Sequence, residues 1–284
     1  MRLFKLFLSS LLIILTGCTT EKTVRIQQSE GVHVHVFNSS IAVLLVGGSG
    51  PVDEDYLVDG IPLYMQLADA LAQNGISSLR LKKRSDYKTI DEEYFEEIQS
   101  ALDALKKQYD TVYLLGHSLG AAVSVVFDDQ VDGLILMGGF VSEVEEVYAL
   151  QLKKKASDDQ KLVIDEELNT ILNLVDDTGF SWFGLPESWW ISVDKLELKE
   201  RLKTLKSPVL VVFSAQDEQV GLEEYKLYQS VLCSHEDAKY VLVEDVNHFF
   251  VDASSQQMSE SVIHQIASWI LKQSSVIINK RCCE

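Results

Sequence analysis

The sequence GHSLG at residues 116–120 places Ser118 between two glycines, directly after the apolar run 111–115. A strand that turns sharply into a helix at such a serine exposes the hydroxyl, and the glycines remove side chains that would clash. The bare pattern is weak evidence, but an apolar strand precedes it and a small-residue helix at 121–127 follows it. We therefore predict that Ser118 is a catalytic nucleophile and not part of a structural turn.

A serine hydroxyl attacks a carbonyl only when a base takes its proton. The chain has six histidines, and His248 follows the apolar run 240–243 across a short loop downstream of the serine. The other five lie inside the serine motif, on an early strand, in a charged loop or within a helix. The sequence therefore predicts His248 as the general base.

A base of this kind needs a carboxylate that fixes its tautomer and stabilises the imidazolium. Asp217 comes four residues after the apolar run 209–213. Glu218 and Asp245 are neighbouring acids that could serve instead. We predict Asp217 as the third member of the triad.

The loop GGSGP at 47–51 follows the apolar run 41–46 and lets backbone N–H groups point at a ligand. We predict that the amides of Ser49 and Leu119 form an oxyanion hole, in which losing one donor costs about 3 kcal/mol in the transition state. The alternative is a glycine turn with no catalytic role.

Apolar runs alternate with helix-like segments along most of the chain, which predicts a mostly parallel, doubly wound sheet of about eight strands. The expected strands are 32–37 (antiparallel), 41–46, 76–81, 111–115, 133–137, 209–213 and 240–243, and the expected helices are 61–73, 90–108, 121–127 and 258–272. The alternation lapses at about 141–206, which predicts a helical cap over the strand ends. Its aromatic residues either line an acyl pocket or dock the cap on the sheet (Trp182, Phe183, Trp189 and Trp190).

Together, the stretches 48–55, 116–120, 208–220 and 247–249 resemble the α/β-hydrolases. The branch includes dienelactone hydrolases, the catalytic domain of prolyl oligopeptidases and bile-acid-CoA:amino-acid acyltransferases. The resemblance implies the α/β-hydrolase fold, the chain order serine, acid, histidine, and hydrolysis of a small-molecule carboxylic ester through an acyl-enzyme, with no cofactor or metal. A thioesterase, a peptidase or a non-catalytic envelope binding lipoprotein are the alternatives.

Two departures from this family put a transfer of substrate in doubt. Tyr56 stands where such families commonly have glycine after the second aspartate of the first motif. Residues 82–85 read KKRS where they commonly read Asp-Lys-Arg-Gly.

Residues 1–18 read as a secretory signal, with a basic start, a short apolar stretch and small residues before Cys18. This resembles a bacterial lipobox and predicts a lipid anchor on Cys18, a tether at 19–23 and a hydrolase domain at 24–284. The expected address is the cell envelope, at the periplasmic face and on the outer membrane if the cell has one; an ordinary signal peptide is the alternative.

Net charge, two histidines and three cysteines bear on binding to nucleic acid, metal binding and disulfide formation. The net charge of −18 disfavours nucleic acid as a partner, because the surface repels phosphates. His33 and His35 share one strand face without a third metal ligand nearby, so we expect a solvated face. Cys233 pairs with Cys282 or Cys283, or all three are free and structurally neutral.

Overall fold

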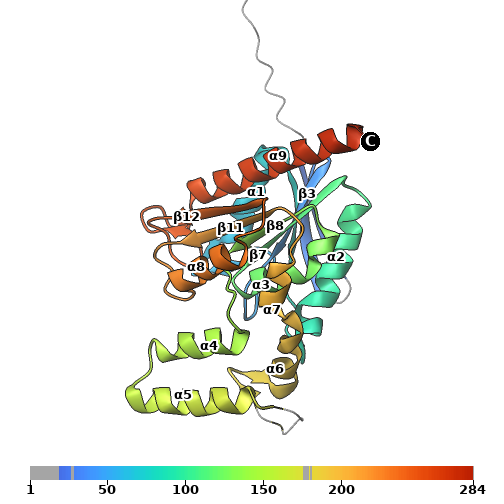
Figure 1. The fold of residues 1–284 in the computed structure, drawn as a ribbon. Helices are drawn as coiled ribbons and strands as arrows, with labels where there is room; N and C mark the ends of the chain where they lie inside the picture. Colours follow the sequence, from blue (N-terminus) through green and yellow to red (C-terminus); the bar gives the residue numbers. More distant parts are fainter. Residues whose placement is uncertain (1–18, 27–28, 175–178, 180, 284) are drawn as a thin grey trace, which may run out of the picture.

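Eight strands form one sheet in the computed structural model, which describes residues 19–26, 29–174, 179 and 181–283 (Figure 1). In spatial order they are β1 (Thr19–Ile26), β2 (Ser29–Val36), β6 (Ser77–Leu81), β3 (Ile41–Val46), β7 (Thr111–His117), β8 (Gly133–Met137), β11 (Val209–Ser214) and β12 (Ala238–Val243). The strands from β6 to β12 are parallel, whereas β1 and β2 pair antiparallel. The predicted fold class is confirmed.

Helices cover both faces of this sheet, and each central strand sends alternate side chains into two separate cores. Val43 and Leu45 of β3 pack on one side, against α1 (Leu63–Gln73) and α9 (Glu260–Cys283). Leu44 faces the other side, covered by α2 (Glu96–Lys106), α3 (Leu119–Ser124) and α8 (Leu222–Val231). Burial on both faces explains the continuous apolar runs, because no face of these strands meets water.

Several element bounds differ from the sequence expectation. The predicted helix 90–108 begins with a π-helical turn, Asp91–Phe95, before α2 starts. Residues 125–130 form a 3₁₀ helix after α3, because Phe127 leaves helical geometry. Two residues of the predicted helix 61–73 pair with Leu57–Val58 (β4) as β5 (Ile61–Pro62), and β13 (Val251–Asp252) pairs with β14 (Gln257–Met258).

The tether predicted at 19–23 is wrong, because these residues belong to β1. Thr19 pairs with Val36, and the carboxylate of Glu21 forms a 2.7 Å ion pair with the buried guanidinium of Arg80 in β6. Strand pairing and this ion pair fix a segment that composition alone presents as polar and free. Cys18 and the predicted signal segment lie outside the described residues.

An insertion between β8 and β11 lies beyond the strand ends and forms a cap (Figure 1). It contains α4 (Val144–Lys153), α5 (Asp158–Ile171), the strand pair β9 (Ser181–Trp182) and β10 (Leu185–Pro186), α6 (Glu187–Val193), a 3₁₀ turn at Asp194–Leu196 and α7 (Leu198–Lys203). Over the part of the chain that the structure describes, no helix is long and apolar enough to cross a membrane.

Candidate active site

Ser118 occupies the turn between β7 and α3 in a strained conformation. Its φ is 54° and its ψ is −122°, a region that non-glycine residues rarely adopt. Its amide donates to the Met137 carbonyl of β8 at 2.9 Å, which anchors the turn on the neighbouring strand. Leu119 begins the helix, so its own N–H has no preceding carbonyl to bond within that helix.

The two glycines of this turn are required by close packing. A Cβ on Gly116 would lie 2.2 Å from the Gly120 carbonyl oxygen, and one on Gly120 would lie 2.5 Å from the Gly47 carbonyl oxygen. The 47–51 loop therefore packs directly against Gly120. Any side chain at position 116 or 120 would clash with backbone atoms, which explains why glycine stands on both sides of Ser118.

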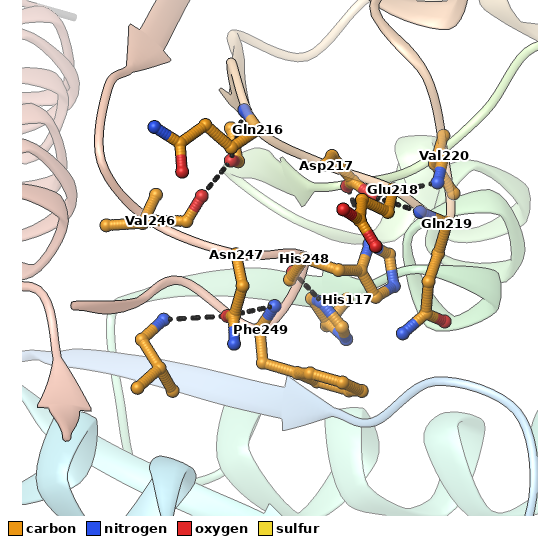
Figure 2. Close-up of polar contacts among 12 residues, drawn as sticks. His117, Gln216, Asp217, Glu218, Gln219, Val220, Val246, Asn247, His248 and Phe249 are labelled. Carbon is orange, nitrogen blue, oxygen red and sulfur yellow. Dashed lines mark hydrogen bonds and ion pairs between the residues drawn. The ribbon is translucent and has the colours of Figure 1, made fainter. Parts of the chain in front are cut away.

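Asp217 and His248 come together from the loops that follow β11 and β12 (Figure 2). His248 Nδ1 donates to Asp217 Oδ2 at 2.6 Å, and both side chains are buried. The other carboxylate oxygen of Asp217 accepts the amides of Gln219 and Val220, each at 2.8 Å. These bonds leave His248 Nε2 as the ring nitrogen that can accept a proton.

The two neighbouring acids do not take this place. Asp245 is exposed and accepts a 3.3 Å hydrogen bond from Gln216. Glu218 lies beside Asp217 in Figure 2, but the hydrogen bond to the imidazole comes from Asp217. Of the three acids that the sequence offered as partner of His248, Asp217 is the one that hydrogen-bonds its imidazole.

Two polar side chains that the sequence analysis gave no role hold these loops in position. Asn247 Oδ1 accepts the amides of Phe249 and Val251 at 2.9 and 3.1 Å, which closes the turn that presents the histidine. Ser214, at the end of β11, donates its hydroxyl to the Val246 carbonyl. The acid loop and the histidine loop are therefore bonded directly to each other.

His117, next to the serine, is a second buried histidine with a structural task. Its Nε2 lies 2.9 Å from the His248 carbonyl oxygen (Figure 2). Its Nδ1 lies 2.7 Å from Tyr56 Oη. Burial, and then the neighbouring His248, lower the pKa of His117 to about 3, so the ring is neutral near pH 7. A carbonyl only accepts, so Nε2 carries the proton and Nδ1 accepts from the Tyr56 hydroxyl.

The same Tyr56 hydroxyl accepts the amide of Gly48 at 3.2 Å, which links the glycine loop to the serine turn. A Cβ on Gly48 would lie 3.1 Å from Ser118 Cβ and 2.9 Å from Tyr56 Oη, so a larger residue would press on the nucleophile. Ser49, the predicted oxyanion donor, is the next residue along this loop. Its role and that of Leu119 stay predictions.

Comparison with known proteins finds esterases and a lipase with the same fold. Esterase EstD of Thermotoga maritima is 27% identical over 256 residues, covering 81% of this chain and 62% of EstD, so the chain spans less than two thirds of that relative. Est1E from Butyrivibrio proteoclasticus superimposes with a TM-score of 0.64 at 16% identity, covering 90% of this chain and 99% of Est1E. A monoacylglycerol lipase of Paleococcus ferrophilus gives 0.59 at 17% identity over 86% and 99% of the two chains. The protein is an α/β-hydrolase by fold. No family model matches the chain.

In this α/β-hydrolase an open pocket of about 1160 Å³ lies between the cap and the histidine loop. Its walls mix amides, charges and apolar groups: Asp59, Gln151, Leu152, Lys154, Lys155, Phe183, Gln216, Glu218, Gln219, Asn247, His248 and Phe249. Lys154 donates to the carbonyls of Glu218 and Gln219, which joins α4 of the cap to the acid loop. The pocket is therefore bounded on one side by the predicted base.

The cap aromatics of the hydrolase divide between the two roles that the sequence left open. Trp182, Trp189 and Trp190 are almost fully buried, and the Trp190 ring lies 5.0 Å from Trp182 in a tilted pair and 4.8 Å from Trp189 in an edge-to-face pair. Phe183 is 43% exposed and lines the pocket. Three tryptophans thus form the core of the cap, and the phenylalanine faces the ligand space.

The remaining groups singled out from the sequence lie away from the candidate site. His33 and His35 both hydrogen-bond the Tyr109 hydroxyl, at 2.8 and 2.7 Å, so their shared strand face is partly covered and not simply solvated. Within the described residues, no group of three or more His, Cys, Asp and Glu side chains could hold a metal. Cys233 is exposed and unpaired.

Proposed function

We propose that this protein hydrolyses carboxylic esters through an acyl-enzyme intermediate. The observation that carries the proposal is the buried 2.6 Å bond between His248 and Asp217, in a site whose serine occupies a strained turn at the end of β7. Ser118 Oγ attacks the ester carbonyl carbon while His248 Nε2 takes its proton. The imidazolium returns that proton to the leaving alkoxide, and water then repeats the two steps on the acyl-enzyme.

The negative charge that forms on the carbonyl oxygen needs donors that are already in place. We assign this task to the backbone amides of Leu119 and Ser49. Gly48 packs against Ser118 Cβ, which supports a position for this loop beside the reacting carbon. The imidazolium is stabilised by Asp217, whose two backbone bonds hold it in place.

Esters are favoured over other acyl substrates because the similar proteins include esterases, EstD among them. A pocket of about 1160 Å³ with Leu152, Phe183 and Phe249 in its walls suits small or medium acyl groups, and its glutamine side chains suit a polar part of the same molecule. This supports a small-molecule ester as substrate.

The test is hydrolysis of p-nitrophenyl esters from acetate to laurate by the full-length protein, beside Ser118→Ala. We expect turnover with the wild type and at least a thousandfold loss in the variant, since the residual rate comes from binding alone. Absence of both turnover and labelling by a fluorophosphonate would contradict the proposal. Labelling without ester turnover would keep the serine chemistry and exclude esters as substrates.

We also propose that Cys18 carries a lipid anchor that attaches the protein to the cell envelope, on the strength of residues 1–18. Thr19 pairs with Val36, at the sheet edge opposite the serine turn, so an anchor there would turn the pocket away from the bilayer. The prediction is that Cys18→Ala moves the protein from the membrane fraction to the soluble fraction. Retention in the membrane would refute the anchor.

A further inference from the structure

Gly48 is held at both its N–H and its carbonyl by side chains from three different elements. The Tyr56 hydroxyl accepts its N–H at 3.2 Å. Its carbonyl oxygen accepts two bonds, from Lys83 Nζ at 2.8 Å and from Tyr94 Oη at 2.7 Å. Three side-chain hydrogen bonds therefore fix the backbone of Gly48, although glycine-rich loops are usually free to adopt several conformations.

The carbonyl bonds of Gly48 also set the direction of the next N–H. In a trans peptide the C=O of one residue and the N–H of the following residue lie in one plane and point in opposite directions. No cis peptide occurs among the described residues. Holding the Gly48 carbonyl toward Lys83 and Tyr94 consequently directs the Ser49 N–H away from them.

Lys83 is itself buried, and its ammonium group bonds Gly48, Tyr94 and Glu93. Its side chain is 6% exposed and its ammonium also donates to Glu93 Oε1 at 2.6 Å. The second oxygen of Glu93 accepts Trp189 Nε1 of the cap at 2.5 Å. Burial lowers the pKa of Lys83, and the Glu93 carboxylate opposes that shift. A buried ion pair contributes little net stability, so a role for this pair is sought in the positions that it fixes.

The local backbone supports the same role. Glu93 and Tyr94 are consecutive, and both lie in the π-helical turn Asp91–Phe95, a geometry often found at functional sites. Both side chains are buried, and both bond Lys83 Nζ. The turn therefore directs two adjacent side chains at one ammonium group.

We propose that Lys83 and Tyr94 are positioning residues that aim the Ser49 amide at the reacting oxygen. Glu93 holds Lys83 with one carboxylate oxygen and accepts Trp189 with the other, and thereby connects the oxyanion loop to the cap. This inference rests on the ester hydrolysis proposed above. It gives a task to Lys83, which keeps the lysine of the Asp-Lys-Arg-Gly pattern.

The test compares full-length Tyr94→Phe with Tyr113→Phe. Tyr113 is a matched control, because its buried hydroxyl bonds Ser274 and Ile270 and lies in the other core. The readouts are kcat and KM on one p-nitrophenyl ester and the Ki of a trifluoromethyl ketone with the same acyl chain. We expect Tyr94→Phe to lower kcat about 10- to 100-fold and raise Ki in parallel, with KM within threefold, because oxyanion donors act mainly on the tetrahedral state.

The lysine is tested as Lys83→Met combined with Glu93→Gln, which removes both charges and avoids an unpaired buried carboxylate. For this double variant we again expect a lower kcat and a higher Ki with little change in KM. Trp189→Phe should lower kcat and raise Ki by a smaller factor. Unchanged kcat and Ki in Tyr94→Phe, or equal losses in Tyr94→Phe and Tyr113→Phe, would overturn the inference. A wild type that neither hydrolyses esters nor reacts with fluorophosphonate would overturn the proposed function instead.

Discussion

Replacing Asp217 by asparagine tests the triad with little change in shape. Two backbone amides donate to Asp217 Oδ1, each at 2.8 Å, so the amide oxygen of the asparagine must face them. Its NH₂ group then faces His248 Nδ1, where the carboxylate oxygen now lies at 2.6 Å. An NH₂ donor forces His248 Nδ1 to accept, which moves the ring proton to Nε2.

A histidine protonated at Nε2 cannot take the proton of Ser118. By analogy with other serine hydrolases in which the wrong tautomer is imposed, we expect kcat to fall about 10⁴-fold, or roughly 5 kcal/mol at 1.36 kcal/mol per tenfold. The thermal midpoint should change little, because each hydrogen bond of Asp217 keeps a partner. Glu218→Gln is the matched control and should stay within about twofold of the wild type.

The assay is single-ester kinetics for both variants, with ¹⁵N chemical shifts of His248 to identify its tautomer. A D217N protein that retains more than a tenth of wild-type kcat would refute the assignment of Asp217. The same conclusion would follow if Glu218→Gln lost more activity than Asp217→Asn.

Three further changes have defined expectations. Gly48→Ala adds a Cβ 3.1 Å from the nucleophile's Cβ and should lower kcat about 100-fold, whereas Gly221→Ala meets nothing within 4 Å and should leave kcat unchanged in the same assay. Burial raises the pKa of Glu145 to about 7, so folding favours its protonated form and its contribution to stability is lost as the pH rises from about 5 to 8. Glu145→Gln should therefore gain thermal stability over the wild type at pH 8 but not at pH 5, and the exposed Glu166→Gln should gain none. Phe183→Ala opens the pocket wall and should raise KM for long-chain esters more than for acetate, measured across a p-nitrophenyl series.

The fold and the meeting of Asp217 with His248 could be predicted because each depends on local pattern. Ser118, Asp217 and His248 each follow an apolar run, and parallel strands bring their carboxyl ends to one edge of the sheet. The geometry places Asp217 on His248 as the sequence order suggests. Hydrophobic pattern and chain order were sufficient for the fold and for placing Asp217 beside His248, and the catalytic roles of the three residues stay predictions.

The supporting residues could not be predicted, because their contacts join distant parts of the chain. Tyr56 meets His117 across 61 residues and Trp189 meets Glu93 across 96. The tether at 19–23 failed for a related reason, since strand pairing with β2 is invisible in the composition of a polar segment. Nothing in the local sequence specifies such partners.

Tyr56, a departure from the family pattern, and Lys83, which matches it, bind the same residue. Tyr56 adopts a φ of 50°, a backbone region that suits glycine, so the tyrosine keeps a glycine-like turn at a conformational cost. Its hydroxyl binds the N–H of Gly48, while Lys83 binds the carbonyl of the same residue. At 82–85 the residues that differ from the family pattern are Lys82 and Ser85, whereas Lys83 keeps its lysine. In the structure, Tyr56 and Lys83 both fix the glycine that packs against Ser118, so the departure at Tyr56 adds a second hold on a loop that the matching lysine also binds.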